Sequence, residues 1–472
     1  MFVGRECEMQ LLREFHKRRT AGLAVCRGRR RIGKSTLIEE FGRGERFYEF
    51  YGLAPREGIA NEHQLKHFGQ MVGTAFGLPA LRFDNWHEAL STLAGLTVEG
   101  KAIVLLDEIS WLASRDKDFA GKLKGVWDTK FKKNDRLILI LCGSVTSWID
   151  DNILNDKGFM GRVSLTITLD ELSMYDANKF WEGAGQVSAA EKLRMLCVTG
   201  GVPRYLEELR PDQTAEQNIK RMCFSPEGLL FTEFDMIFRD IFASRSATFK
   251  RIVEALSGPP LEPGDLCRAL DVKPTGGLSG MLSILAASGM VARDFAWDTS
   301  GRKTALSKYR IRDNYLRFYL RYIDRQKEKI EQGLFRDAHL ENLVNWDAIM
   351  GYQFENLILN NLDAVIRRLD IPPESIISAA PFFQRKTRRH DACQIDLLIH
   401  TRNTLYVCEI KFRKRIGAGV MEEVKRKIEK LPGRSKYSVR PVLIYEGELA
   451  PAVNRSDFFC RLISAAELLN HP

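Results

Sequence analysis

The spacing of hydrophobic positions predicts alternating strands and helices in the first part of the chain. Three apolar runs are typical of buried strands, namely GLAVCRG (22–28), KAIVLLDEISWL (101–112) and RLILILCGS (136–144). The segment STLIEEF (35–41) instead spaces its apolar residues as one face of a helix does. This alternation favours an α/β fold with a parallel sheet.

The loop between the first strand and its helix carries a phosphate-binding pattern. GRRRIGKS fits G-x-x-x-x-G-K-S, with Gly28, Gly33, Lys34 and Ser35 at the required places. The glycines let backbone N–H groups face the phosphates, Lys34 reaches the terminal phosphates, and Ser35 offers a hydroxyl to Mg²⁺. Thr36 follows as a further cofactor-binding position. The motif in its strand–loop–helix context predicts ATP and Mg²⁺ as ligands.

Two acidic residues end the second apolar run. Asp107 at the strand end would hold Mg²⁺ through water, while Glu108 would polarise the attacking water as general base. The alternative is an ordinary buried strand followed by an acid that caps a helix. Ser144 ends the third run, where a polar side chain would sense the terminal phosphate.

A set of motifs resembles the AAA+ class of NTPases, and more narrowly the archaeal-type ATPase family close to the STAND group. These motifs cover about the first 330 residues and read FVGRECEM, GRRRIGKS, IVLLDE, CGSVTSWI, GRVSLTITLDELS and TGGVPRYL. The resemblance implies that the FVGRE turn, Gly200, Gly201 and Pro203 border the adenine. It also implies that Arg162 acts in trans within a homo-oligomer, and that Arg204 is a sensor from the lid. For each arginine, the alternative is a surface ion pair.

The chain of 472 residues is too long for one ordinary core. We expect a P-loop core over 1–175, a helical lid over 176–244, a winged helix-turn-helix over 245–325 and a connecting helix over 326–345. Three helical patterns, the last spanning 275–295, and a β-wing that ends near KYRIRD indicate the winged module. Its third helix would lie in a DNA major groove. Because glycines begin that helix and offer few contacts, packing against the lid is an equal alternative.

Two strand patterns near the end of the chain carry acidic residues. QIDLLIH (394–400) contains Asp396, and LYVCEIKF (405–412) contains Glu409 and Lys411. A hairpin turn between them would make the strands antiparallel. Glu409 and Lys411 would then share one face, because side chains alternate along a strand, with Asp396 beside them.

These groups suit a hard divalent cation. The Asp396 and Glu409 carboxylates, with the Ile410 carbonyl, provide oxygen ligands of the kind that Mg²⁺ or Mn²⁺ prefers. Water held there would attack phosphorus, while Lys411 orients it or stabilises the developing charge.

This constellation resembles the PD-(D/E)xK nuclease superfamily. The resemblance implies a restriction-endonuclease-like α/β domain, which we expect over 346–472, with Glu355 on a helix as a further catalytic acid. The chain departs from the superfamily pattern in one place, since Ile395 rather than proline precedes Asp396. The alternative is a surface salt bridge within the Glu-x-Lys triplet on an edge strand.

The charge of the chain is concentrated in the same region. The formal net charge is +10, and residues 381–440 hold sixteen Lys plus Arg against six Asp plus Glu, so the rest is balanced. Such an excess suits phosphodiester substrates, here DNA with RNA as the alternative, although a charge run is also typical of a solvated face. His390 lies near the acids and receives no role.

Other features exclude some classes of protein. The nine cysteines occur singly with no CxxC pair, which argues against a disulfide framework or a zinc ribbon. No window approaches ~18 uninterrupted apolar residues, and the N-terminus lacks the pattern of a signal peptide. We therefore expect a cytoplasmic protein with no membrane partner.

The sequence as a whole predicts an ATP-binding and ATP-hydrolysing protein with a metal-dependent endonuclease domain that acts on DNA. One alternative is an ATP-dependent STAND-like switch or DNA-binding regulator whose nuclease-like domain does not cut. Another is an RNA nuclease or defence effector.

Overall fold

The computed structural model describes residues 2–54, 58–144, 146–183, 185–242, 245–273, 276–298, 301–386, 388 and 391–470. The chain forms two compact units. Unit 1 comprises Met1–Asp170 with the short segments Ile237–Ala243 and Ala287–Gly289, and unit 2 comprises the remainder. The five-part division expected from the sequence stays a prediction.

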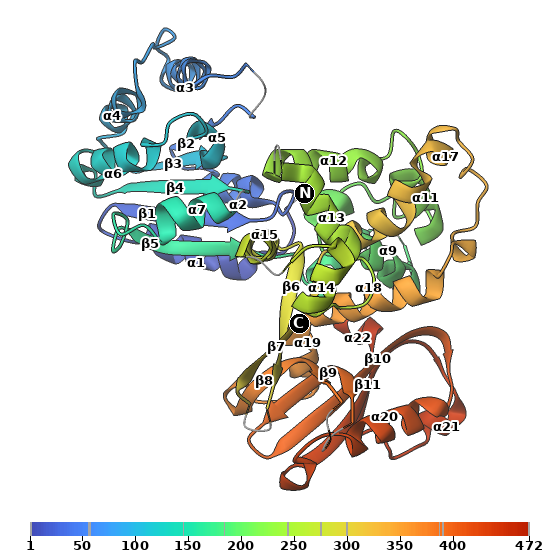
Figure 1. Cartoon of the computed structure of the whole chain (residues 1–472). Helices are drawn as coiled ribbons and strands as arrows, with labels where there is room; N and C mark the ends of the chain where they lie inside the picture. Colours follow the sequence, from blue (N-terminus) through green and yellow to red (C-terminus); the bar gives the residue numbers. More distant parts are fainter. Residues whose placement is uncertain are drawn as a thin grey trace. The chain divides into compact units, whose positions relative to one another are not determined.

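Unit 1 is built on a five-stranded parallel sheet in the order β2-β3-β4-β1-β5. Its strands are β1 (Gly22–Gly28), β2 (Phe47–Tyr51), β3 (Ala102–Asp107), β4 (Leu137–Gly143) and β5 (Val163–Leu169). Its helices are α1 (Glu6–His16), α2 (Lys34–Gly42), α3 (Asn61–Phe76), α4 (Trp86–Leu96), α5 (Ile109–Leu112), α6 (Phe119–Thr129) and α7 (Thr146–Ile149). Figure 1 shows α3, α4 and α6 on one side of this sheet and α1 on the other.

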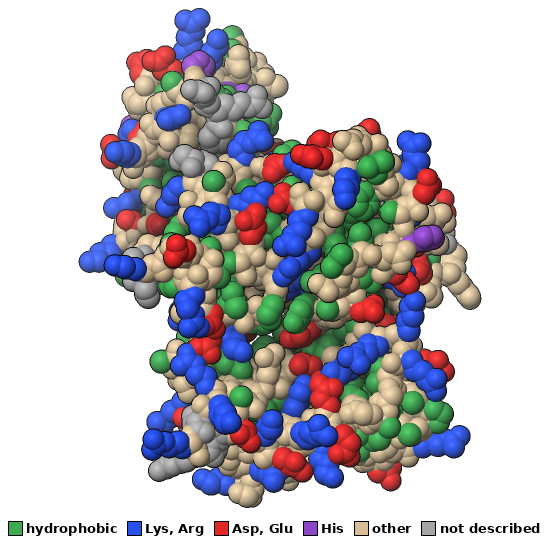
Figure 2. Space-filling view, turned by 45° about the vertical axis from the view of Figure 1, so that its right-hand side comes forward, with side chains coloured by type: hydrophobic (Ala, Val, Ile, Leu, Met, Phe, Trp, Pro, Cys, Tyr) green, Lys and Arg blue, Asp and Glu red, His purple; other side chains and the backbone are tan. Residues whose placement is uncertain are grey.

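Surface charge, cysteine pairing and helix hydrophobicity are each visible in the structure. On the face drawn in Figure 2, Lys and Arg side chains lie among Asp and Glu side chains rather than in one unbroken patch. All nine cysteines are free, and only Cys7 and Cys460 are exposed. Among the described residues, no helix combines the length and the apolar character needed to cross a membrane.

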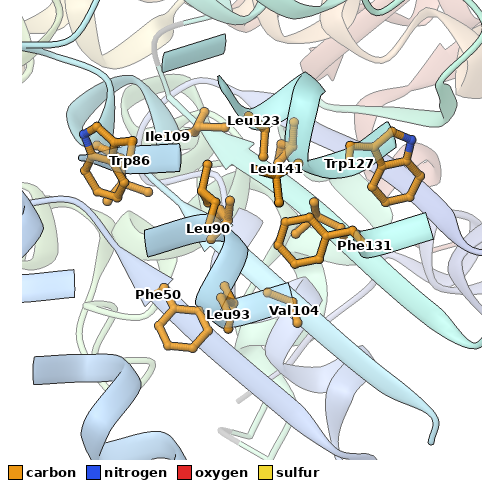
Figure 3. Close-up of a cluster of buried hydrophobic side chains, with 14 of the residues drawn as sticks. Phe50, Trp86, Leu90, Leu93, Val104, Ile109, Leu123, Trp127, Phe131 and Leu141 are labelled. Atoms are coloured by element: carbon orange, nitrogen blue, oxygen red, sulfur yellow. The ribbon is translucent and has the colours of Figure 1, made fainter. Parts of the chain in front are cut away.

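Alternate residues of the central strands β1, β3 and β4 pack against different helices. Leu23 and Val25 of β1 belong to a core with α3, α4 and α6, whereas Ala24 and Cys26 pack with α1 and α2. These three strands are therefore buried on both faces, which explains the unbroken apolar runs in the sequence. Figure 3 shows the side chain of Trp86 from α4 within the first of these cores.

Unit 2 begins with helices and ends in a mixed sheet. The helices between Glu171 and the winged module are α8 (Met174–Asn178), α9 (Ala189–Thr199), α10 (Pro203–Leu206), α11 (Ala215–Cys223) and α12 (Leu229–Phe242), the last of which enters unit 1 at Ile237. The last sheet has the order β12-β11-β10-β9-β8. Its strands are β8 (Ile376–Gln384), β9 (Cys393–Thr401), β10 (Thr404–Ile416), β11 (Ser438–Leu449) and β12 (Arg461–Ser464). The helices of this part are α18 (Trp346–Asn360), α19 (Leu362–Arg368), α20 (Gly419–Glu429), α21 (Pro451–Asn454) and α22 (Ala465–Asn470).

The elements expected for a winged module are present between these parts. They are α13 (Ser246–Ala255), α14 (Pro263–Leu270), α15 (Gly276–Ala287) and the antiparallel hairpin β6 (Val291–Trp297) and β7 (Lys303–Ile311). The helical pattern predicted over 275–295 was too long, because the chain enters β6 after a left-handed turn at Gly289. The wing packs on the C-terminal sheet, with Trp297 edge-on to Phe382 of β8 at 5.7 Å between ring centroids.

The connecting helix predicted over 326–345 is shorter in the structure, because the α-helical part ends at Glu331. The chain is helical from α16 (Asn314–Phe318) through a π-helical segment, Tyr319–Ile323, and a 3₁₀ turn, Asp324–Gln326, to the end of α17 (Lys327–Glu331), and a 3₁₀ turn, Leu340–Asn342, follows before α18. Left-handed glycine at Gly333 ends the helical pattern early, since its φ of 74° cannot continue a right-handed helix.

We predict that Trp86→Ala destabilises unit 1 by roughly 3–5 kcal/mol, because it empties a core position and removes the hydrogen bond that Nε1 donates to Asn61. Denaturant unfolding followed by circular dichroism would measure the loss. Leu78→Ala, at a side chain that is 42% exposed, is the control and should shift stability by no more than about 0.5 kcal/mol. Equal losses in both variants would contradict the packing described here.

Candidate functional site

The predicted phosphate loop joins β1 directly to α2. Gly28 has a φ of 153°, and a Cβ there would lie 2.5 Å from the carbonyl oxygen of Leu169 on β5. Gly33 precedes the helix in the left-handed region, with a φ of 85°. Gly28 is thus required by its positive φ and its close approach to β5, and Gly33 by its left-handed conformation.

The start of α2 is arranged to receive an anion. No side chain caps the helix, and its first turn holds no acidic residue, so backbone N–H groups remain for an external acceptor. Lys34 is only 6% exposed, and its Nζ donates to the Arg29 carbonyl at 3.1 Å across the loop. Thr36 lies exposed in the same turn.

Ser35 and Asp107 meet although 72 positions separate them in the chain. The Ser35 hydroxyl donates to Asp107 Oδ2 at 2.6 Å, and the Glu108 backbone N–H donates to Asp107 Oδ1 at 2.8 Å. The contact arises because parallel strands present their carboxyl ends at one edge of the sheet. A hydroxyl beside a carboxylate is a donor set that fits Mg²⁺.

Glu108 adopts the left-handed conformation, with a φ of 44°, just after β3. Its carboxylate accepts from the Ser144 hydroxyl, at 2.9 Å to Oε2 and 3.2 Å to Oε1. Ser144 was expected to sense a phosphate, and here it contacts the predicted general base instead. Its phosphate-sensing role stays a prediction.

Glu49 on β2 is a residue of this site that the sequence analysis missed. Burial, followed by the nearby Asp107 and Glu39 carboxylates, raises the pKa of Glu49 to about 7. The signal available in the sequence was a single acid inside the aromatic stretch FYEFY. Because that strand lay outside the recognised motifs, its register beside β3 was not foreseen.

Two arginines of unit 1 have specific partners. The Arg5 guanidinium, from the FVGRE turn, donates to the Ile32 carbonyl at 3.1 Å and to the Asp170 carbonyl at 2.7 Å, so it braces the phosphate loop. Arg162 forms a two-pronged pair with Asp128 on α6, with N–O distances of 2.9 and 2.7 Å. Hydrogen bonds from Arg162 lower the pKa of Asp128.

The predicted lid residues lie in unit 2. Gly201 donates its N–H to Glu171 at 3.1 Å, and a Cβ at Gly201 would lie 2.1 Å from the Leu172 carbonyl. Pro203 starts α10. Arg204 pairs with Glu208 at 2.7 Å and with Glu207 at 3.2 Å. The nucleotide-contacting roles of these residues stay predictions.

The C-terminal carboxylates converge on one face of the mixed sheet. The predicted hairpin is confirmed, since β9 and β10 are antiparallel and Leu405 pairs with His400. The Ile410 N–H donates to Asp396 Oδ2 at 2.9 Å, which fixes Asp396 beside the β10 backbone. Glu409 on β10 is completely buried. The two acids are therefore not on opposite sides of the sheet.

Two lysines neutralise this acidic pair. Lys411 Nζ lies 2.7 Å from Glu409 Oε1, as the alternation along the strand predicted. Lys427 on α20 lies 2.8 and 2.6 Å from the two Glu409 oxygens and 3.8 Å from Asp396 Oδ1. Glu423, one helical turn before Lys427, accepts from Lys411 at 3.1 Å.

Lys427 and Glu423 are also residues that the sequence analysis missed. The run KRK (425–427) had been counted only as basic charge. The usable signal was the four-residue spacing of Glu423 and Lys427, which places both on one helix face. Only the packing of α20 on the sheet turns that face toward the acids.

Burial and neighbouring negative charge oppose ionisation of Asp396 and Glu409. Burial and then the Glu355 charge raise the pKa of Asp396 to about 6, while burial and then Asp396 raise the pKa of Glu409 to about 7. Burial also raises the pKa of Glu355, which lies on α18. Burial alone would lower the pKa of Lys427, but Asp396 and Glu409 outweigh it and raise the pKa.

The alternative of a surface salt bridge on an edge strand does not describe Glu409 and Lys411. The Glu409–Lys411 ion pair exists, but β10 lies between β9 and β11 and is not an edge strand. Among the described residues, no group of three or more His, Cys, Asp or Glu side chains is arranged to hold a metal ion. The oxygens of Asp396 and Glu409 suit Mg²⁺ or Mn²⁺ chemically, but each Glu409 oxygen already accepts from a lysine.

The basic segment of the C-terminal part is only partly described. Thr387, Arg389 and His390 lie outside the described residues. Arg385 donates to Glu262 at the start of α14, at 3.1 Å from Nε, so this arginine links the C-terminal sheet to the winged module.

Comparisons with known proteins agree with the fold. No protein-family profile matches the chain. An uncharacterised protein of Methanocaldococcus jannaschii is 25% identical over 360 residues, which cover 76% of each chain. The solved Walker-type ATPase of Pyrococcus abyssi has a TM-score of 0.50 at 20% identity and covers 68% of this chain and 96% of that one. The ORC2 protein of Aeropyrum pernix has a TM-score of 0.42 at 15% identity, with 71% and 95% covered.

The fold class follows from these observations. The strand order of unit 1, the glycine-rich loop at the end of β1 and the likeness to the Pyrococcus abyssi structure define an α/β chain with a P-loop domain of the AAA+ type. The C-terminal part adds a separate mixed sheet.

We predict that Glu49→Gln stabilises unit 1 at pH 8 but not at pH 4.5. In the folded protein the pKa of Glu49 is raised to about 7, so stability present below its unfolded pKa is lost as the pH rises through 7. Glutamine carries no charge to bury, so the expected gain at pH 8 is roughly 1–2 kcal/mol after allowance for partial exposure. Denaturant unfolding without nucleotide would measure it, with exposed Glu99→Gln as control. An identical effect at both pH values would contradict the assignment.

Proposed function

We propose that unit 1 binds and hydrolyses ATP with Mg²⁺. The observation that carries this proposal is the hydrogen bond from Ser35 to Asp107, at 2.6 Å, directly beside the uncapped start of α2. It brings a metal-binding hydroxyl, a metal-binding carboxylate and a phosphate-binding helix end to one place.

Each residue then has a defined part in hydrolysis. Lys34 and the N–H groups that follow Gly33 bind the phosphates. To do so, the Lys34 ammonium must leave the Arg29 carbonyl and donate to a phosphate oxygen instead. Bound Mg²⁺ supplies charge neutralisation on the phosphates. Glu108 accepts a proton from the attacking water, and Ser144 positions that carboxylate through its hydrogen bond.

The remaining arginine and lid assignments belong to the same proposal. Arg162 acts on the nucleotide of a neighbouring copy in a homo-oligomer, and it must leave Asp128 to do so. Gly200, Gly201 and Pro203 border the adenine, and Arg204 is the sensor.

Lys34→Ala should abolish ATP turnover, because the terminal phosphates lose their cation. Glu108→Gln should still bind ATP within a few-fold of wild type but hydrolyse it about 10²–10⁴-fold more slowly. Phosphate release and nucleotide binding by fluorescence would measure the two effects. The control is Arg43→Ala, just after α2, where the side chain is 77% exposed. Turnover retained by Lys34→Ala would refute the role of the loop.

As a second candidate function, we propose that the C-terminal domain cleaves DNA with a divalent metal. The supporting observation is the convergence of Asp396, Glu409 and Lys411 on one sheet face, with Glu355 close enough to raise the pKa of Asp396. Asp396 and Glu409 would hold Mg²⁺ or Mn²⁺, and Lys411 would stabilise charge on the phosphate. The basic excess over 381–440 suits a phosphodiester substrate.

Labelled DNA and RNA, each with Mg²⁺ or Mn²⁺ and with or without ATP, separate this function from its rivals. We expect metal-dependent cuts in DNA that Asp396→Ala and Glu409→Ala reduce at least about 100-fold, since each removes a metal ligand. Glu355→Ala and Lys411→Ala should also reduce them. Lys425→Ala, exposed on the same helix as Lys427, is the matched control. DNA binding without any cuts would favour the switch or regulator, whereas cuts in RNA alone would favour the RNA nuclease or defence effector.

A further inference from the structure

Lys427 occupies the place where the two candidate metal ligands face each other. Its Nζ lies 2.8 and 2.6 Å from the two oxygens of Glu409 and 3.8 Å from Asp396 Oδ1. Lys411 contacts one oxygen of Glu409, and both lysines also lie near Glu423, at 3.1 Å for Lys411 and 3.5 Å for Lys427. Lys427 is therefore the cation that bridges the acidic pair.

The same side chain also lines a hollow between α20 and the start of β9. The hollow has a volume of about 520 Å³, and its lining includes Gln394, Arg426, Lys427 and Lys430. Gln394, Arg426 and Lys430 are exposed, whereas Lys427 is partly buried. Glu422 and Glu423 lie on the same wall, so three cations and two carboxylates line it. A lysine with four rotatable carbons has room there to turn away from the acids.

A divalent cation and the Lys427 ammonium compete for the same oxygens. Both Glu409 oxygens accept from Lys427, so a metal ion that uses Glu409 must displace at least one of these contacts. Like charges also repel strongly in a buried site. A phosphodiester in the hollow offers the ammonium a new partner at the moment when it leaves Glu409.

Building on the proposed nuclease function, we propose that Lys427 is an exchangeable internal cation. A nucleic-acid phosphate that binds in the hollow beside Arg426 and Lys430 draws the Lys427 ammonium away from Glu409. The Glu409 carboxylate is then free to bind the divalent metal. Substrate and metal then bind cooperatively, because each binds better to the state with Lys427 turned outward. Lys427 is a positioning residue for the metal, and the hollow is the phosphate-binding subsite.

Mn²⁺ binding to the full-length protein, measured by electron paramagnetic resonance without nucleotide, tests this exchange. Lys427→Gln removes the charge but keeps a hydrogen-bond donor, and we expect it to bind Mn²⁺ at least about tenfold more tightly than wild type. Lys427→Arg keeps the charge and should bind as weakly as wild type. Lys425→Gln, exposed on α20 and outside the lining of the hollow, should stay within about twofold. Adding Glu409→Gln to Lys427→Gln should remove the tight site.

A second measurement adds a nucleic-acid ligand. A phosphorothioate single-stranded oligonucleotide should strengthen Mn²⁺ binding to wild type, and Lys427→Gln should largely lose this coupling. Glu409-dependent Mn²⁺ binding that is equal in wild type and Lys427→Gln, with no response to the oligonucleotide, would overturn the exchange and leave the nuclease function standing. Absence of any Glu409-dependent Mn²⁺ site in all proteins would overturn both.

Discussion

A buried carboxylate must find donors or cations within the fold, and this requirement organises both candidate sites. A carboxylate removed from water loses its hydration, so it stays ionised only where N–H groups, hydroxyls or ammonium groups replace that hydration. Asp107, only 7% exposed, receives the Ser35 hydroxyl and the Glu108 N–H. Glu409 is fully buried and receives two lysines. The positions of the other groups follow from these contacts.

The two sites meet the requirement differently, and this difference has chemical consequences. Around Asp107 the partners are neutral groups, so the local charge stays negative and favours an incoming cation. Around Glu409 the partners are two lysine ammonium groups, so positive charge already lies beside the acidic pair before any metal enters. The first arrangement suits direct binding of Mg²⁺ with a nucleotide. The second suits a site whose access is controlled by a side chain.

Much of this organisation was predictable from local patterns. The loop from Gly28 to Ser35 and the acids after β3 follow from spacing within a few residues, as does the hairpin that carries Asp396 and Glu409. Where prediction fell short, the missing information was a local turn or a contact distant in the chain. The helical pattern ends before the left-handed Gly333, and the hydrogen bond from Ser144 to Glu108 joins residues 36 positions apart. Glu49 and Lys427 were overlooked because no local pattern shows which side chains lie opposite them.

The sequence by itself therefore determined the phosphate loop, the strands β1, β3 and β4 with the helix α2, and the alternation that puts Glu409 and Lys411 on one face. These depend on backbone conformation and on periods of two or 3.6 residues, which short stretches encode. Tertiary structure alone decided that α20 delivers Lys427 to the acids and that β2 brings Glu49 beside Asp107. Such contacts depend on how separate elements pack, since burial and neighbouring charge arise only when the chain is folded.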